Sequence, residues 1–177
     1  MRKRRKGCGK RGKGCGAIAR YNPIDMRFLR EALTLAGLAF QIGAVWAAWN
    51  TLPDRVPSHY GFSGRADAYG ARSSLIVLPA VSIGLYLLIT AVSSFPQLLN
   101  YPVAVTDKNR DRLQAIALAM IGWIKAEMTW SFAYVSWAIV REAHGVSGGL
   151  GWAFLPLTLG AVGATIAIAA VQVARAA

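Results

Sequence analysis

The feature that most constrains this chain is a series of long apolar segments without a charged side chain. Such segments extend over 32–49, 74–95 and 150–174. A helix of about 20 residues crosses the hydrocarbon core of a bilayer, so each segment has the length of a membrane span. Because 55% of the residues are hydrophobic, the composition is not that of a disordered protein. Two cysteines are too few for a disulfide-stapled secreted domain.

A further candidate span differs from the others because it contains two charged side chains, Lys125 and Glu127. Thr106 is a residue type that caps helix N-termini, and Asp107 suits the positive end of the helix dipole, so we expect this helix to begin near residue 107. Its membrane-spanning part is expected at 113–140. If the last ~20 residues before Arg141 form the crossing, Lys125 lies about one turn inside the boundary, where its ammonium group can reach the lipid headgroups, and Glu127 lies slightly deeper.

These segments predict an all-α fold, a polytopic membrane protein built as a bundle of four transmembrane helices. Patterns of small residues four positions apart include Gly43, Gly84 and Gly160 and predict close packing between helices. Whether some of these faces serve a partner subunit is left open. The expected organisation is a basic tail at 1–28, spans at 29–50, 74–95, 113–140 and 150–174, outer loops at 51–73 and 141–149, and a cytoplasmic loop at 96–112.

The positive charge of the chain is concentrated at its amino end. The sequence has 20 Lys and Arg residues against 8 Asp and Glu residues, and 11 of the basic residues lie within positions 1–30. Lys and Arg remain on the cytoplasmic side of membrane proteins, which predicts that the amino terminus is cytoplasmic. The outer loops then hold only Arg55, Arg65, Arg72 and Arg141. With four spans, both termini are expected in the cytoplasm.

The basic tail contains patterns that resemble ligand-binding motifs. Its glycine-rich run at 7–14 resembles dinucleotide and phosphate loops, but no strand precedes it and no Ser or Thr follows Lys13. Cys8 and Cys15 lack the spacing and the further ligands of a zinc site. We therefore interpret the tail as an arm that binds anionic lipid, and we do not expect nucleic acid as a partner, because no aromatic platform accompanies the charge. An alternative hypothesis is that translation begins at Met26.

The segment 51–73 is more elaborate than a tether between two helices needs to be. Pro53 and Pro57 restrict the backbone and favour extended conformations in the residues before them. Gly64 and Gly70 permit tight turns among polar residues. We therefore expect a compact, structured cap on the outer face of the membrane.

This loop and the sequence after it carry residues that resemble a known family. In the loop these are Leu52, Pro53, Asp54, Pro57, His59, Gly64, Asp67, Gly70 and Arg72, followed by Pro79. Further on they are Tyr101, Pro102, Val103, Thr106, Asn109 and Lys125. Over about 45–130 the chain resembles the domain-of-unknown-function family 1648, the amino-terminal part of SdpI-type bacterial membrane proteins. The best-known member of that family is an immunity protein against a secreted killing peptide, so the resemblance implies a bacterial plasma-membrane protein with an immunity or signalling role.

No arrangement of residues in the sequence indicates catalysis. Asp54, His59 and Asp67, with His144 from the other outer loop, provide groups for a weak zinc site, but no metal-binding spacing such as H-E-x-x-H is present. We favour the alternative that His59 and Asp67 hydrogen-bond to the backbone of the loop. Because G-x-S-x-G is absent as well, we expect no enzyme, no metal and no cofactor.

Glu127 is a candidate for a proton or ligand site, because ionisable side chains inside membranes are often functional. Lys125 is two positions away on a nearly opposite helix face, so the two side chains cannot pair. The alternative is a structural hydrogen bond within the bundle. Possible donors on the same face are Trp123, Trp130, Ser131 and Tyr134.

The leading functional hypothesis is that the outer loop recognises an extracytoplasmic peptide or a membrane-protein partner. One alternative is a small transporter or ion-coupled subunit that uses Glu127, and another is an accessory subunit of a larger membrane complex. Arginines of the loop are available for anionic groups. The recognition residues expected are Pro53, Asp54, Arg55, Pro57, His59, Gly64, Arg65, Asp67, Gly70 and Arg72.

Overall fold

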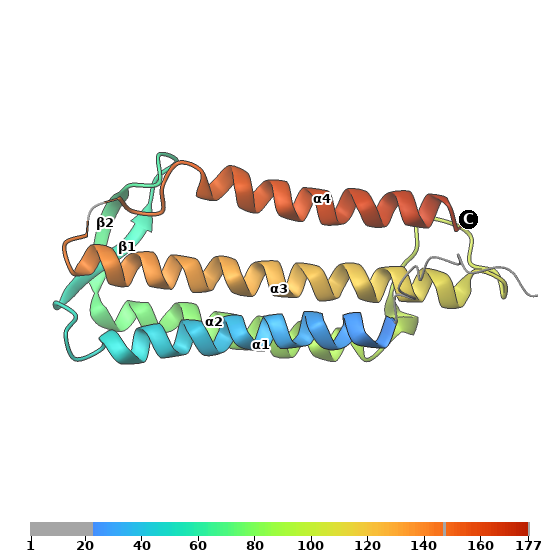
Figure 1. Cartoon of the computed structure of the whole chain (residues 1–177), viewed down its shortest axis with the longest axis horizontal. Helices are drawn as coiled ribbons and strands as arrows, with labels where there is room; N and C mark the ends of the chain where they lie inside the picture. Colours follow the sequence, from blue (N-terminus) through green and yellow to red (C-terminus); the bar gives the residue numbers. More distant parts are fainter. Residues whose placement is uncertain (1–22, 147, 177) are drawn as a thin grey trace, which may run out of the picture.

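Four long helices lying side by side dominate the chain (Figure 1). The structure is a computed structural model that describes residues 23–146 and 148–176, with side chains from Met26 onwards. Most of the predicted basic tail lies outside the described residues. The elements in chain order are α1 (Pro23–Ala48), β1 (Arg55–Tyr60), β2 (Ala66–Ala71), the 3-10 helix η1 (Arg72–Ile76), α2 (Val77–Ser93), the 3-10 helix η2 (Pro96–Leu98), α3 (Arg110–Ala143) and α4 (Phe154–Ala174).

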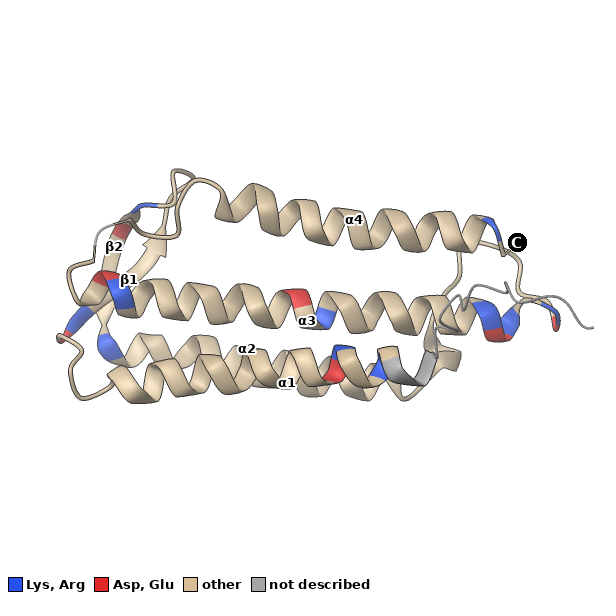
Figure 2. Ribbon diagram, in the orientation of Figure 1, with Lys and Arg blue, Asp and Glu red and all other residues tan. Residues whose placement is uncertain are grey.

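Three helical segments are long and apolar enough to cross a membrane: Met26–Ala48, Arg72–Ser93 and Phe154–Ala174. They correspond to the first, second and fourth predicted spans, so the prediction of a multi-pass helical membrane protein is confirmed at this level. The fourth long helix, α3, has 34 residues but a lower apolar content. Charged side chains gather near the two ends of the molecule, and few lie along the middle of the helices (Figure 2).

Helix α3 is the centre of the fold. It packs against α1, α2 and α4, and it is the main neighbour of α4 (Figure 1). Its buried side chains include polar ones, Lys125, Thr129 and Ser136, whereas α4 buries only Ala169. The helix with the most polar side chains is therefore enclosed by the three apolar helices.

The boundaries of the helices differ from the predicted ones for local reasons. Helix α3 begins at Arg110 rather than near residue 107. The Oδ1 atom of Asn109 accepts a hydrogen bond from the backbone N–H of Thr106, and Asn109 Nδ2 donates to the carbonyl of Ala104. These bonds form a turn that ends immediately before the helix. The predicted N-cap at Thr106 is therefore wrong, and the residue before the helix is Asn109.

Helix packing also differs from the small-residue prediction. A Cβ atom added to Gly43, Gly84 or Gly160 would meet no other atom within 4 Å, so these glycines make no close helix contact in the described part of the chain. Gly37 does: its added Cβ would lie 3.0 Å from Cγ2 of Thr129, at the contact between α1 and α3. The small-residue pattern correctly predicted a close contact between helices at a glycine, but it named the wrong glycines.

The segment between α1 and α2 forms an antiparallel hairpin of two strands, which the sequence did not predict as strands. Arg55 pairs with Ala71 and Pro57 with Tyr69. The backbone N–H of Arg72 donates to the carbonyl of Asp54, which makes Asp54–Arg72 a hydrogen-bonded pair. Hydrogen-bonded and non-hydrogen-bonded pairs alternate along an antiparallel ladder, so Pro57–Tyr69 is a non-hydrogen-bonded pair. The backbone nitrogen of Pro57 therefore does not face β2. The register thus accommodates a proline inside a strand.

A hydrophobic core fixes the hairpin to the helix ends. Val56 of β1 is completely buried and packs with Val45 and Leu52 near the end of α1, Leu75 of η1 and Ile139 of α3. Burying a side chain of this size contributes about 1.5–3 kcal/mol. The hairpin is therefore part of the packed fold and not a loop that merely follows the helices.

Candidate functional site

Two regions collect the residues expected to be functional: the hairpin segment, residues 51–73, and the polar positions of α3. In the hairpin segment the structure brings together His59 of β1 and Asp67 of β2. His59 Nδ1 lies 2.5 Å from Asp67 Oδ1, and both side chains are more than half exposed. The expectation that each would hydrogen-bond to loop backbone is wrong, because they bond to each other across the two strands.

His144, which the disfavoured zinc alternative would bring to this pair, has other partners. His144 Nδ1 donates to the carbonyl of Val140 at 2.7 Å, and its Nε2 lies 2.9 Å from Thr51 Oγ1. These contacts hold the ring against the end of α3. Within residues 23–146 and 148–176 no group of three or more His, Cys, Asp and Glu side chains is arranged to hold a metal ion.

The turn of the hairpin rests on the connection between α3 and α4. Gly64 has a φ of +73°, which favours glycine, and a Cβ added there would lie 2.6 Å from the carbonyl oxygen of Gly151. The backbone N–H of Leu150 donates to the carbonyl of Gly64 at 2.8 Å. Gly64 is therefore required because two backbones meet at this point, a role that one sequence alone could not reveal.

A hollow of about 490 Å³ opens between this turn and the start of α4. His59 and Asp67 stand at its wall beside apolar groups, and Phe62 at the turn is almost fully exposed. The hollow thus combines a hydrogen-bonded histidine–aspartate pair with apolar side chains. Its lining residues are His59, Tyr60, Gly61, Phe62, Gly64, Asp67, Leu150, Gly151, Phe154 and Leu155.

The other predicted hairpin residues have separate positions. Pro57 of β1 is buried, whereas Pro53, Asp54 and Arg65 are exposed. The guanidinium of Arg55 donates to the carbonyl of Tyr69, at 3.4 Å. The guanidinium of Arg72 lies 5.8 Å from the ring centre of Trp49. A Cβ atom added to Gly70 would lie 3.2 Å from Cβ of Ser58.

Tyr60 connects the hairpin to the end of α3. Burial of its phenol raises its pKa above the ordinary value, and the nearby carboxylate of Glu142 raises it further. The phenol therefore stays protonated well into the alkaline range. Neither Tyr60 nor Glu142 was identified from the sequence, because only the fold brings them together.

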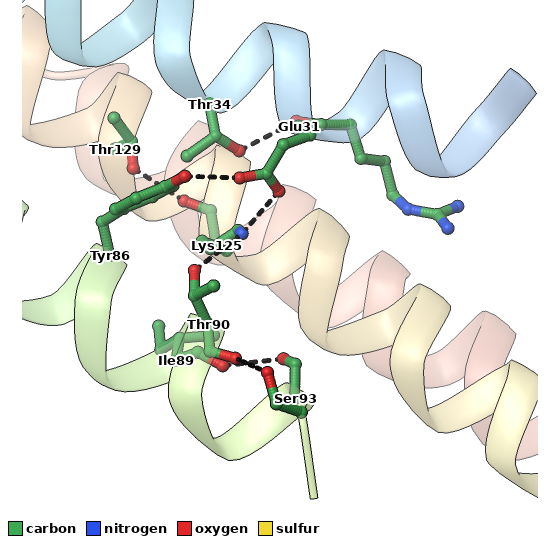
Figure 3. Close-up of polar contacts among 10 residues, drawn as sticks. Glu31, Thr34, Tyr86, Ile89, Thr90, Ser93, Lys125 and Thr129 are labelled. Atoms are coloured by element: carbon green, nitrogen blue, oxygen red, sulfur yellow. Dashed lines mark hydrogen bonds and ion pairs between the residues drawn. The ribbon is translucent and has the colours of Figure 1, made fainter. Parts of the chain in front are cut away.

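Lys125 is buried among three helices and does not extend to the headgroups as predicted. Its Nζ atom lies 2.6 Å from Oε2 of Glu31 on α1 and 3.2 Å from Oγ1 of Thr90 on α2 (Figure 3). The hydroxyl of Tyr86 donates to the other oxygen of Glu31 at 2.6 Å. The Nζ atom is also 4.7 Å from the centre of the Tyr86 ring. Four side chains thus form one polar cluster between α1, α2 and α3.

Glu127 points to the opposite neighbour. Its Oε1 atom accepts a hydrogen bond of 2.6 Å from Thr165 on α4, and not from the aromatic donors expected on its own helix. Trp130 Nε1 donates instead to the carbonyl of Leu33, and the hydroxyl of Tyr134 to that of Leu150. Oε2 of Glu127 is buried without a hydrogen-bond partner among the described residues.

Sequence reasoning missed the partners of both charged residues of α3. Glu31, Tyr86 and Thr165 lie on other helices, 94, 39 and 38 positions from Lys125 or Glu127, so no spacing within one helix could find them. A charged residue inside an apolar segment was the available signal, and it indicates that a partner exists. Glu31 lies immediately before the first uncharged segment and is the carboxylate that Lys125 requires.

Residues 36–83 match the family described as Domain of unknown function (DUF1648). The resemblance to that family predicted from the loop residues is confirmed in this region, whereas the further likeness to SdpI-type proteins stays a prediction. An uncharacterized protein of Archaeoglobus fulgidus is 36% identical over 62 residues, which represent 30% of this chain and 34% of that protein. The chain therefore spans about a third of the length of the curated relative it matches. No solved structure matches the chain. The family match thus covers the hairpin segment together with parts of the two helices that flank it.

Proposed function

We propose that this chain is a plasma-membrane protein with four spans that recognises an extended peptide at its hairpin, on the extracytoplasmic face. Helix α3 has 34 residues, or about 51 Å at 1.5 Å per residue, so its length allows a fourth crossing. Its enclosure by α1, α2 and α4 supports that assignment. The concentration of Lys and Arg in the sequence before α1 supports cytoplasmic termini and an external hairpin.

The observation that carries the proposal is the open edge of β2. In the described part of the chain β2 pairs with β1 alone, so its second edge has no strand beside it. The alternation that faces Pro57 away from the ladder also directs the backbone groups of Tyr69 and Ala71 away from β1. A peptide at this edge would replace the 3.4 Å contact of the Arg55 guanidinium with the carbonyl of Tyr69. An extended peptide binds such an edge by adding a strand, because backbone N–H and C=O groups are already aligned for it.

The hollow beside the hairpin turn supplies what strand addition lacks, which is selectivity among side chains. Asp67 belongs both to β2 and to the wall of this hollow, so a strand placed along β2 runs toward it. The carboxylate of Asp67 and the exposed ring of Phe62 suit a peptide with both basic and apolar side chains. This composition is an expectation drawn from the lining.

The test removes one edge donor without disturbing the fold. Ala71 has φ −63° and ψ 147°, values that proline adopts, and its N–H faces away from β1. Ala71→Pro is expected to fold and to lose one backbone hydrogen bond to the peptide, worth about 1 kcal/mol or roughly fivefold in affinity. Ala71→Ser keeps the N–H and is the matched control.

The measurement uses the full chain in nanodiscs to retain peptides from the culture medium of the native host, identified by mass spectrometry. Wild type and Ala71→Ser should retain the same peptide, and Ala71→Pro should retain about one fifth as much at subsaturating peptide. Equal retention by all three variants would exclude strand addition. If His59→Ala and Asp67→Ala leave both retention and the host's tolerance of the peptide unchanged, the hollow has no part in recognition.

An immunity or signalling role follows from peptide recognition only if the bound peptide is toxic or informative to the cell, and host tolerance tests this directly. The second candidate function is transport, which the buried carboxylate of Glu127 between α3 and α4 favours. Flux in proteoliposomes that does not respond to Glu127→Gln would exclude it. Stoichiometric co-purification with other membrane proteins would instead support an accessory subunit.

A further inference from the structure

A second hollow, of about 560 Å³, lies between α3 and α4 and shares Leu150, Gly151 and Phe154 with the hollow beside the hairpin turn. Its volume is within the range of small-molecule sites in proteins. Most of its wall is apolar, and much of it is aromatic. The residues used below are Glu127, Trp130, Tyr134, Trp152 and Phe154.

Glu127 contributes the only carboxylate that lines this hollow. Its Oε1 atom is bonded by Thr165, while Oε2 is buried and has no donor in residues 26–146 and 148–176. Of the ion pairs found within these ranges, none involves Glu127. An ionised carboxylate without a partner is costly in an apolar environment. Within these ranges Glu127 thus has a hydrogen-bond donor in Thr165 but no cationic partner.

The aromatic walls indicate which kind of cation fits. Tyr134 and Phe154 are stacked with ring centres 5.1 Å apart, and Trp130 and Trp152 lie on the same hollow. Aromatic faces attract organic cations, above all ammonium groups with apolar substituents. A metal ion needs several oxygen ligands at short range, whereas this wall offers one carboxylate and few hydroxyl groups.

We propose that the hollow between α3 and α4 binds a monovalent organic cation with an apolar body, and that Glu127 is its counter-ion. The aromatic side chains enclose the apolar body, and the Glu127 side chain in the wall of the hollow supplies the negative charge. Trp152 is largely exposed and lies at the start of the apolar segment of α4, so it stands at the mouth of the site. The inference does not depend on peptide recognition at the hairpin, and it concerns binding whether or not transport follows.

The experiment measures binding of tritiated tetraphenylphosphonium to the full chain in phosphatidylcholine nanodiscs, with empty nanodiscs as background. This probe carries a permanent charge, so its own protonation does not enter the result. Triphenylphosphine oxide is the neutral aromatic competitor. We expect saturable binding of the cation that sodium chloride and the neutral compound do not displace. Glu127→Gln should weaken it at least tenfold, which corresponds to about 1.4 kcal/mol.

Matched variants separate the site from general effects. Glu142→Gln removes the same charge from the end of α3, and Trp46→Leu removes an equally exposed tryptophan from α1; both should bind as wild type does. Trp152→Leu should weaken binding by threefold or more through loss of a cation–π contact.

Three results would overturn the inference. The first is equal affinity of wild type and Glu127→Gln for the phosphonium ion, given that both elute as single species of the same size. The second is equal affinity for the neutral compound, which would mean that Glu127 holds a proton and the hollow is merely apolar. The third is displacement of the probe by sodium ions, which would indicate an inorganic cation site. If the phosphonium ion binds as expected while the hairpin variants do not alter peptide retention, peptide recognition is refuted and the cation site stands.

Discussion

Removing one member of the Glu31–Lys125 pair should cost more than removing both. The Lys125 side chain is 7% exposed and that of Glu31 is 40% exposed. Glu31→Gln therefore leaves a buried ammonium group without its counter-charge, with only neutral acceptors such as the new amide oxygen and the hydroxyl of Thr90. Lys125→Met instead leaves a carboxylate that is better exposed and still bonded by Tyr86. The two single variants should be unequally destabilised.

The magnitude follows from the burial of each charge. Breaking a buried ion pair by removing one partner costs about 3–5 kcal/mol, because an uncompensated charge remains. We assign that cost to Glu31→Gln. For Lys125→Met we expect about 1–3 kcal/mol, the cost of a lost partner for a group that is partly exposed. The double variant has no buried charge and should lie within about 1 kcal/mol of wild type.

Thermal unfolding in nanodiscs, followed by tryptophan fluorescence, measures these differences. For a chain of this length 1 kcal/mol shifts Tm by about 2–4 °C, so Glu31→Gln should melt roughly 10 °C below wild type and the double variant within about 4 °C. Glu142→Gln is the control for loss of a carboxylate elsewhere. If both single variants melt within about 2 °C of wild type, or if the losses simply add in the double variant, the pair does not hold the three helices together.

The remaining predictions concern the hairpin. Gly64→Ala should destabilise its docking by about 2 kcal/mol or more, because the new Cβ meets the backbone of Gly151; hydrogen exchange at the turn should accelerate, whereas Gly43→Ala should leave it unchanged. The raised pKa of Tyr60 means that the folded state retains a proton which the unfolded state releases near pH 10, so stability should fall as pH rises above about 10. Tyr60→Phe should remove that part of the slope in Tm against pH, and an unchanged slope would contradict the assignment.

The spans predicted best from the sequence were those without a charged side chain, which need no polar partner on another helix. Three uncharged segments have the length of a bilayer crossing, and each is a helix in the structure. The hairpin was predicted as structured but not as strands, because Pro57 lowers the strand propensity of β1. Only the register, which turns Pro57 away from the ladder, makes that proline acceptable.

The candidate functional residues were likewise predicted only in part. His59 and Asp67 were selected from the loop, and they do meet. The partners of Lys125 and Glu127 were not found, since a contact between helices depends on how each helix is rotated about its axis. That rotation is set by packing over the whole bundle, so it cannot be derived from a short stretch of sequence.

The polar side chains of α3 explain both its central position and its lower apolar content. At about 100° per residue, Lys125 and Ser136 are 11 positions apart and share one face, whereas Glu127 lies roughly 200° from Lys125. Ser136 accepts a hydrogen bond of 3.0 Å from Gln41 on α1, so that face is joined to α1 at two levels. Glu127 is joined to Thr165 of α4 on the other side.

Each polar contact therefore fixes the rotation of α3 relative to one neighbour. In lipid a polar side chain has no solvent to bond, so it must find a partner on another helix, and the helix that carries most of them becomes the centre. The polar side chains that hold α3 in place also lower its apolar content. Replacing Lys125 together with Glu31 by neutral residues should preserve stability, yet it should weaken the preference for one rotation of α3. Two sets of cysteine crosslinks between α1 and α3 in that double variant, against one set in wild type, would establish this, and a single set in both would refute it.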